Sequence, residues 1–98
     1  DLIIVSGYNV YPNEVESVIA AHPKVLEVGV IGEKSRTSDE TIKAVIVKKD
    51  PSLTVQEIRD WCRERLTGYK RPRRIVFVDS LPKSPVGKIL RRELSNLK

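Results

Sequence analysis

The sequence predicts a small α+β domain of two layers, with an N-terminal β-hairpin, a mainly antiparallel three-stranded sheet and about three helices. Short runs rich in β-branched residues alternate along the chain with amphipathic segments of helical spacing. The chain contains no internal repeat and no low-complexity segment. Its 98 residues suit a single domain with a modest hydrophobic core.

Residues 2–11 are expected to form the β-hairpin. The stretch LIIV is β-branched and short, SGYN supplies turn residues, and VYP resumes an extended conformation. Ser6, Gly7 and Tyr8 fall within this turn sequence.

A first helix is expected to begin near Pro12 or Asn13, because proline suits the first helical position. Glu14 and Glu16 complement the positive N-terminal end of the helix dipole. Pro23 ends the helix, since the residue before a proline is pushed out of the helical region. The apolar stripe of this helix consists of Val15, Val18 and Ile19.

Three strands are expected to build the sheet. Residues 25–31 and 41–49 are rich in β-branched side chains, and the polar stretch GEKSRTSDE joins them. We expect these two strands to pair antiparallel. The stretch RIVFVD, which starts at Arg74, is the third strand.

The second helix has the clearest boundaries. Thr54 and Glu57 have the spacing of a capping box, and Leu53 and Ile58 stand at the positions of a hydrophobic staple. Gly68 is expected to end this helix. The predicted buried face consists of Ile58, Trp61, Cys62 and Leu66, so Trp61 is expected in the core.

A last helix is expected to start near Lys88. Leu90, Leu94 and Leu97 are spaced along one side of it. Lysine favours the last turn of a helix over the first, because the N-terminus already carries a partial positive charge. The position of Lys88 therefore predicts an anionic partner.

Composition limits the possible functions. Lys plus Arg is 18 against 13 for Asp plus Glu, a net charge of +5, which favours anionic partners such as nucleotides, nucleic acid or acidic lipid; the alternative is an ordinary solvated surface. The single cysteine, Cys62, forms no internal disulfide and fits a reducing, cytoplasmic compartment. No apolar run approaches the ~18 residues of a membrane span.

Several kinds of catalytic or metal site are disfavoured. His22 has no second histidine and no cysteine at ligand spacing, so we interpret it as a surface histidine at a helix end and expect no metal site. Cys62 lies on an apolar helix face, which favours an inert core thiol. Glu14 and Glu16 are two positions apart on a helix and cannot face one another as an acid/base pair.

Two loops are candidate binding sites. The run YKRPRR concentrates Lys70, Arg73 and Arg74, which suits a phosphate-bearing ligand; the alternative is a solvated basic loop. The run PKSPVGK places the flexible Gly87 directly before Lys88, so that the backbone can approach a ligand and the lysine brings a mobile charge. Lysines that follow a loop glycine are common, and a purely structural role stays open here.

The two ends of the sequence together carry a family resemblance. The opening DLIIVSGYNVYPNEVE and the closing LPKSPVGKILRREL resemble the C-terminal domain of the adenylate-forming superfamily, which includes acyl-CoA synthetases, luciferase and peptide-synthetase adenylation domains. With LTGYKRP between them, these motifs are most like bacterial long-chain-fatty-acid-CoA ligases. The resemblance covers residues 1–98 and implies a mobile C-terminal domain whose large N-terminal domain is absent, with Asp1 just after the interdomain hinge.

The resemblance also implies a reaction. A fatty acid attacks the α-phosphate of ATP to give an acyl-adenylate, and the thiol of CoA then displaces AMP, with a rotation of the small domain between the two half-reactions. The intact parent would be an acid–thiol ligase that uses ATP, CoA and Mg²⁺, bound mainly by the N-terminal domain, and the isolated domain is expected to be inactive.

Within this reaction, the resemblance implies roles for residues at both ends of the chain. Lys88 aligns with the lysine that reaches the carboxylate and phosphate oxygens during adenylation, on a loop that contains Gly87. Ser6, Gly7 and Tyr8 resemble the loop that borders the pantetheine channel, and this role is compatible with a plain hairpin turn. Lys70, Arg73 and Arg74 are the candidates for the phosphates of CoA.

Alternatives to a fatty acid ligase stay open at this point. Another adenylate-forming enzyme, acting on a medium-chain or aryl acid or loading a carrier protein, carries the same motifs. A basic nucleic-acid-binding module is disfavoured, because an RNA-stacking sheet needs clustered aromatic residues and the third strand offers only Phe77. Peripheral membrane contact of the parent is compatible with long acyl substrates, although no basic amphipathic helix marks an anchor.

Overall fold

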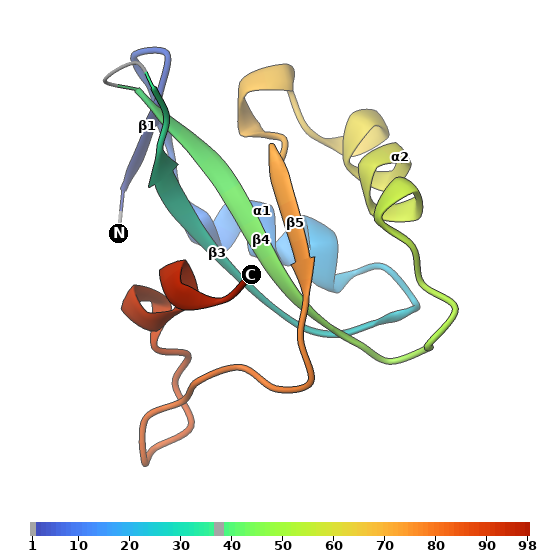
Figure 1. Ribbon diagram of the computed structural model, residues 1–98. Coiled ribbons are helices and arrows are strands. Elements are labelled where there is room, and N and C mark those ends of the chain that lie inside the picture. Colours follow the sequence, from blue (N-terminus) through green and yellow to red (C-terminus); the bar gives the residue numbers. More distant parts are fainter. Residues whose placement is uncertain (1, 37–38) are drawn as a thin grey trace.

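The computed structural model describes residues 2–36 and 39–98 and confirms a small α+β domain (Figure 1). The expected hinge position, Asp1, lies outside the described residues. In chain order the elements are β1 (Ile3–Val5), β2 (Tyr8–Val10), α1 (Pro12–Ala20), β3 (Val25–Lys34), β4 (Glu40–Lys48), α2 (Val55–Arg65), the 3₁₀ helix η1 (Gly68–Lys70), β5 (Arg74–Phe77) and the 3₁₀ helix η2 (Arg91–Asn96).

The hairpin is closed by a tight turn. β1 and β2 pair antiparallel with Val5 opposite Tyr8, so that Ser6 and Gly7 alone form the connection. Both have positive φ, 50° and 83°, as a type I′ turn requires. Ile3 and Val10 face the core and are buried.

The three-stranded sheet has the order β3-β4-β5. β3 and β4 pair antiparallel as expected, and both strands extend farther into the polar stretch GEKSRTSDE than their sequence signals indicated. β5 pairs parallel to β4, so the sheet is mixed. The parallel pair follows from the connection, because α2 carries the chain back across the sheet between β4 and β5.

Both faces of β4 are covered. Ile42, Ala44 and Ile46 pack in the main core with residues of α1 and α2. Lys43, Val45 and Val47 alternate with them and are also buried, and a second cluster joins Val45 and Val47 to Leu81 and Leu94 of the C-terminal segment. This segment therefore covers the face of the sheet that the α-helices leave open (Figure 1).

The capping box of α2 is confirmed. The Thr54 hydroxyl accepts a hydrogen bond from the Glu57 backbone N–H at 3.1 Å, and the Glu57 carboxylate accepts one from the Thr54 N–H at 3.1 Å. Leu53 and Ile58, the predicted staple pair, are both buried in the main core. The end of the helix was predicted too late: α2 ends at Arg65, and Gly68 begins η1.

We expect Thr54→Ala to lower the free energy of unfolding by about 1 kcal/mol, because it removes the acceptor for an otherwise unsatisfied helix N–H. Chemical denaturation of the chain measures this loss. Thr67→Ala is the matched control, since Thr67 precedes η1 without any side-chain cap hydrogen bond. Equal losses for both variants would contradict a role for the cap.

Two aromatic positions differ from expectation. Trp61 is only partly buried; its indole Nε1 donates to the Val18 carbonyl at 2.7 Å, and the Arg65 guanidinium lies over its ring. His22 is buried, 9% exposed, with its ring edge against Trp61 and its Nδ1 accepting from the Lys24 N–H. The turn after α1 folds His22 back under Trp61, an arrangement that helical spacing alone does not reveal.

The helix predicted to start at Lys88 is wrong. Lys83 and Ile89 instead form an antiparallel bridge, and the 3₁₀ helix begins only at Arg91. Gly87, at φ = 86°, and the prolines around Ser84 favour a turn over a helical start. Of the three predicted apolar positions, Leu94 is buried and Leu90 and Leu97 are half-buried.

Candidate functional site

Lys88 sits in a compact loop that Ser84 closes. The Ser84 N–H donates to the Lys88 carbonyl at 2.8 Å, and the Gly87 N–H donates to the Ser84 carbonyl at 2.9 Å. The Ser84 hydroxyl accepts from the Lys88 N–H at 3.3 Å. The backbone of Lys88 is thus held locally while its side chain is exposed, and among the described residues no carboxylate neutralises its ammonium.

The hairpin turn lies beside the basic loop. Tyr8, which follows the Ser6–Gly7 turn, stacks on Tyr69 of η1 with ring centroids 4.3 Å apart and planes 20° from parallel. A Cβ atom built on Gly7 would meet no atom within 4 Å, so the turn is open to approach from outside. The structure therefore joins two groups of candidate residues that are some 60 positions apart in the sequence.

The three basic candidates differ in their surroundings. Lys70 pairs with Glu14 at 2.8 Å, and this hydrogen bond raises the pKa of Lys70. Arg74 pairs with Glu33 at 2.9 Å. Arg73 is exposed and, within residues 2–36 and 39–98, has no carboxylate partner, so it is the best placed of the three to bind a phosphate.

A hollow of about 400 Å³ links Arg73 to the hairpin turn. Its lining includes Ser6, Arg36, Glu40 and Arg73. Arg36 was not among the residues that the sequence singled out, because it lies in a polar connection without a motif. Its proximity to Ser6 exists only in the folded chain, so no signal in the sequence marked it.

The Lys88 loop and the hairpin turn lie at opposite ends of the domain. Figure 1 shows the hairpin turn and η1 at the top, and the loop that follows β5, which contains Lys88, at the bottom. The two groups of candidate residues are therefore separated along the length of the domain (Figure 1).

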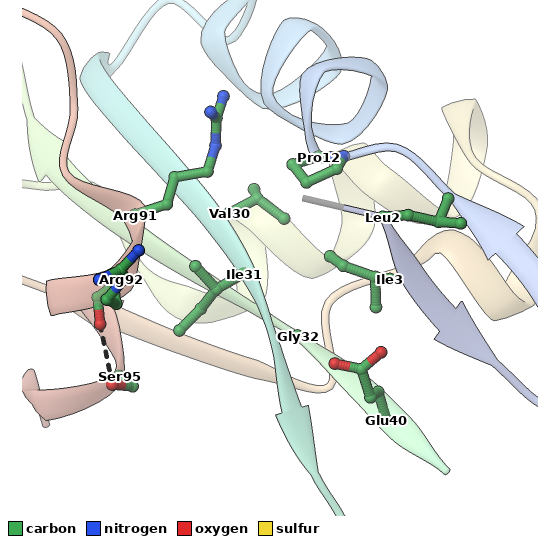
Figure 2. A pocket seen from close by; sticks show the side chains of 10 residues that line it. All are labelled: Leu2, Ile3, Pro12, Val30, Ile31, Gly32, Glu40, Arg91, Arg92 and Ser95. Atoms are coloured by element: carbon green, nitrogen blue, oxygen red, sulfur yellow. Dashed lines mark hydrogen bonds between the residues drawn. The ribbon is translucent and has the colours of Figure 1, made fainter.

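A groove of about 280 Å³ lies between β1, β3 and η2 (Figure 2). Its walls are both apolar and polar: Leu2, Ile3 and Val30 are among the apolar lining residues, and Arg91 and Arg92 stand on its η2 side. The Glu40 carboxylate at its edge accepts a hydrogen bond from the Ile4 N–H at 3.0 Å. None of the residues predicted to act in binding or catalysis lines this groove.

The part of the chain that the structure describes contains no group of three or more His, Cys, Asp or Glu side chains suited to a metal ion. The resemblance assigns Mg²⁺ mainly to the N-terminal domain, and no step below uses it. Burial raises the pKa of the Cys62 thiol, which makes it a poor nucleophile and a poor ligand. No helix in the described ranges is long and apolar enough to cross a bilayer.

A family model, the AMP-binding enzyme C-terminal domain, matches residues 14–88. The chain belongs to this family. Among curated relatives, the long-chain-fatty-acid–CoA ligase of Escherichia coli O157:H7 is 57% identical over 94 residues, which is 96% of this chain and 17% of that protein. The 2-succinylbenzoate–CoA ligase of Geobacillus kaustophilus is 48% identical over 98 residues, 99% of this chain and 20% of its own length.

The fold matches solved adenylate-forming enzymes. The o-succinylbenzoate CoA synthetase of Bacillus subtilis, in complex with its acyl-adenylate intermediate, is 40% identical, with a TM-score of 0.93 over 100% of this chain and 20% of that protein. A double mutant of the same enzyme was solved with a product analogue. The chain thus spans about one fifth of the length of these relatives. The roles of Lys88, Ser6, Gly7, Tyr8, Gly87 and the basic loop stay predictions.

Proposed function

We propose that this chain, residues 1–98, is the mobile C-terminal domain of a long-chain-fatty-acid–CoA ligase. The domain serves both half-reactions in turn. The observation that carries the proposal is the separation of the two candidate ends (Figure 1). With the Lys88 end toward the N-terminal domain, the ammonium stabilises charge as a fatty carboxylate attacks the α-phosphate of ATP. After rotation, the hairpin turn and Arg73 face the incoming CoA.

The proposal also specifies the acyl substrate, a long-chain fatty acid. Support for a fatty acid comes from the relative at 57% identity, whereas the succinylbenzoate relatives favour an aryl acid as the second candidate. The acyl pocket belongs to the N-terminal domain, so this domain alone is compatible with both. The proposed compartment is the cytoplasm, with peripheral membrane contact of the parent when its acyl substrate is in a bilayer.

Assays of the full-length protein distinguish a fatty acid substrate from an aryl acid substrate. We expect ATP- and CoA-dependent AMP release with palmitate and oleate to exceed that with octanoate, benzoate or 2-succinylbenzoate. A clear preference for 2-succinylbenzoate or benzoate would replace the fatty acid with the aryl acid. Failure of every carboxylic acid to support pyrophosphate exchange would contradict the adenylate-forming reaction itself.

We expect Arg73→Glu in the full-length protein to raise the KM for CoA roughly 10-fold, because a hydrogen bond to a charged group contributes about 1.5 kcal/mol. Pyrophosphate exchange should be unchanged, since CoA takes no part in it. Lys49→Glu, an exposed charge reversal directly after β4, is the control. An unchanged CoA dependence in Arg73→Glu would make the basic loop an ordinary solvated surface.

A further inference from the structure

Lys43 occupies a buried position in the sheet, where an apolar residue is expected. It lies in β4 between Ile42 and Ala44, on the sheet face that it shares with Val45 and Val47, and its side chain is 0% exposed. A buried ammonium is costly unless its hydrogens are satisfied. The partners of Lys43 therefore indicate what this position does.

Most of these partners belong to the C-terminal segment. The ammonium of Lys43 donates to the carbonyls of Leu94, at 2.9 Å, and Leu97, and Ser95 offers a third carbonyl at 3.5 Å. The Glu33 carboxylate lies 3.5 Å away on the neighbouring strand. The last carbonyls of a helix have no partner within it, so Lys43 caps the C-terminal end of η2 from the sheet.

A second polar contact holds the start of η2. The Arg91 guanidinium donates to both carboxylate oxygens of Glu16 on α1, from Nε at 3.1 Å and from Nη2 at 2.7 Å. Such two-point pairs fix orientation as well as distance. Glu16 is itself held, because it accepts the Val30 N–H at 2.9 Å and its side chain is only 15% exposed.

We propose that Glu16 and Lys43 are positioning residues for Lys88. Together with their partners, Arg91 and the carbonyls of Leu94 and Leu97, they form a C-terminal clasp that holds the segment on the sheet. The bonds between Ser84 and Lys88 set the shape of the lysine loop but not its place on the domain. The clasp, which starts three residues after Lys88, sets that place together with the packing of Leu81 and Ile89 against the second cluster.

This inference rests on the proposed role of Lys88 in adenylation and adds the residues that make the role possible. A misplacement of about 1 Å by a change remote from the chemistry can cost up to about 10²-fold in rate. The clasp acts in the half-reaction that uses Lys88. It has no part in the thioester-forming half-reaction, in which the opposite end of the domain is engaged.

The test uses Glu16→Gln and Lys43→Met in the full-length protein. Each variant is expected to lower pyrophosphate exchange about 10- to 10²-fold, while thioester formation from supplied acyl-adenylate stays within about twofold of the parent. Glu14→Gln and Lys24→Met are matched controls. They break ion pairs of 2.8 and 2.9 Å outside the C-terminal segment, and both should keep the parent's exchange rate.

Hydrogen–deuterium exchange provides a readout besides activity. In both clasp variants, peptides that cover residues 84–97 should exchange faster, while peptides of β3 and β4 keep their protection. Faster exchange throughout the sheet, with equal losses in both half-reactions, would overturn the proposal, because the contacts would then be merely structural. If Lys43→Met does not fold, Glu16→Gln alone decides, since it leaves the core residues unchanged.

Lys88→Ala distinguishes a failure of the clasp proposal from a failure of the proposed function on which that proposal rests. If Lys88→Ala lowers pyrophosphate exchange and the two clasp variants do not, the clasp proposal is overturned and the proposed function stands. If Lys88→Ala itself keeps the parent's rate, the proposed function fails, and the positioning role fails with it. A loss in all three variants, with thioester formation spared, is the expected result.

Discussion

Lys88→Ala in the full-length protein is expected to suppress adenylate formation, measured as pyrophosphate exchange, by at least ~10²-fold. The proposed role of the ammonium is to stabilise negative charge as the carboxylate attacks the α-phosphate. Thioester formation from chemically supplied acyl-adenylate should be largely intact, because the proposed rotation would by then have carried the lysine away. This split between half-reactions distinguishes loss of one charge from general damage.

The structure indicates that this substitution leaves folding unchanged. The Lys88 side chain is exposed and, in the described part of the chain, is neither buried against the core nor paired with a carboxylate. The bonds that shape its loop use its backbone N–H and carbonyl, which alanine keeps. Thermal unfolding of the variant should therefore match that of the parent.

Lys83→Ala is the internal control for charge. Lys83 lies in the same loop, five residues earlier, but its ammonium pairs with Glu27. Loss of such an exposed ion pair costs about 0–1 kcal/mol, so a much smaller effect on exchange is expected. An exchange rate near the parent's in Lys88→Ala would show that the motif is assigned wrongly and that the lysine is an ordinary solvated residue.

Gly7→Leu is expected to impair thioester formation by at least ~10-fold while adenylate formation is largely kept, because a side chain at this turn would enter the path proposed for the pantetheine arm. Within the domain, a Cβ at Gly7 meets nothing within 4 Å, so the substitution creates no internal clash. Its internal cost is backbone strain at φ = 83°, about 1–2 kcal/mol.

Gly7→Asn separates bulk from strain, since asparagine tolerates the left-handed region. If bulk in the channel is the cause, Gly7→Asn should also impair thioester formation, with a thermal stability close to that of the parent. Equal losses in both half-reactions of Gly7→Leu, together with lower thermal stability, would argue for misfolding. Circular dichroism of the chain monitors this control.

The local signals in the sequence identified the elements that depend on near neighbours. The capping box of α2 involves residues three positions apart, and the hairpin turn needs only two residues with positive φ. Interactions between residues so close in the chain can be read from a short stretch of sequence, so the capping box and the hairpin were both predictable. The family motifs at both ends were readable for the same reason, because each is a contiguous stretch.

The last helix illustrates where local spacing misleads. Leucines at helical spacing predicted a helix from Lys88, yet Leu94 is buried through a 3₁₀ turn whose end is capped by Lys43. That partner is 51 positions away. The parallel pairing of β5 was missed for a related reason, since strand direction depends on how α2 returns the chain.

The sequence by itself determined the fold class, the family and the candidate residues of the two loops, because propensity, capping and motif all act over a few neighbouring residues. Only the tertiary structure decided which candidates are available. It pairs Lys70 with Glu14 and Arg74 with Glu33, leaves Arg73 exposed, and stacks Tyr8 on Tyr69. These contacts join residues that are far apart in the chain. Their free energies depend on the distance between the groups and on their burial, and both are set only when the sheet and the helices pack together.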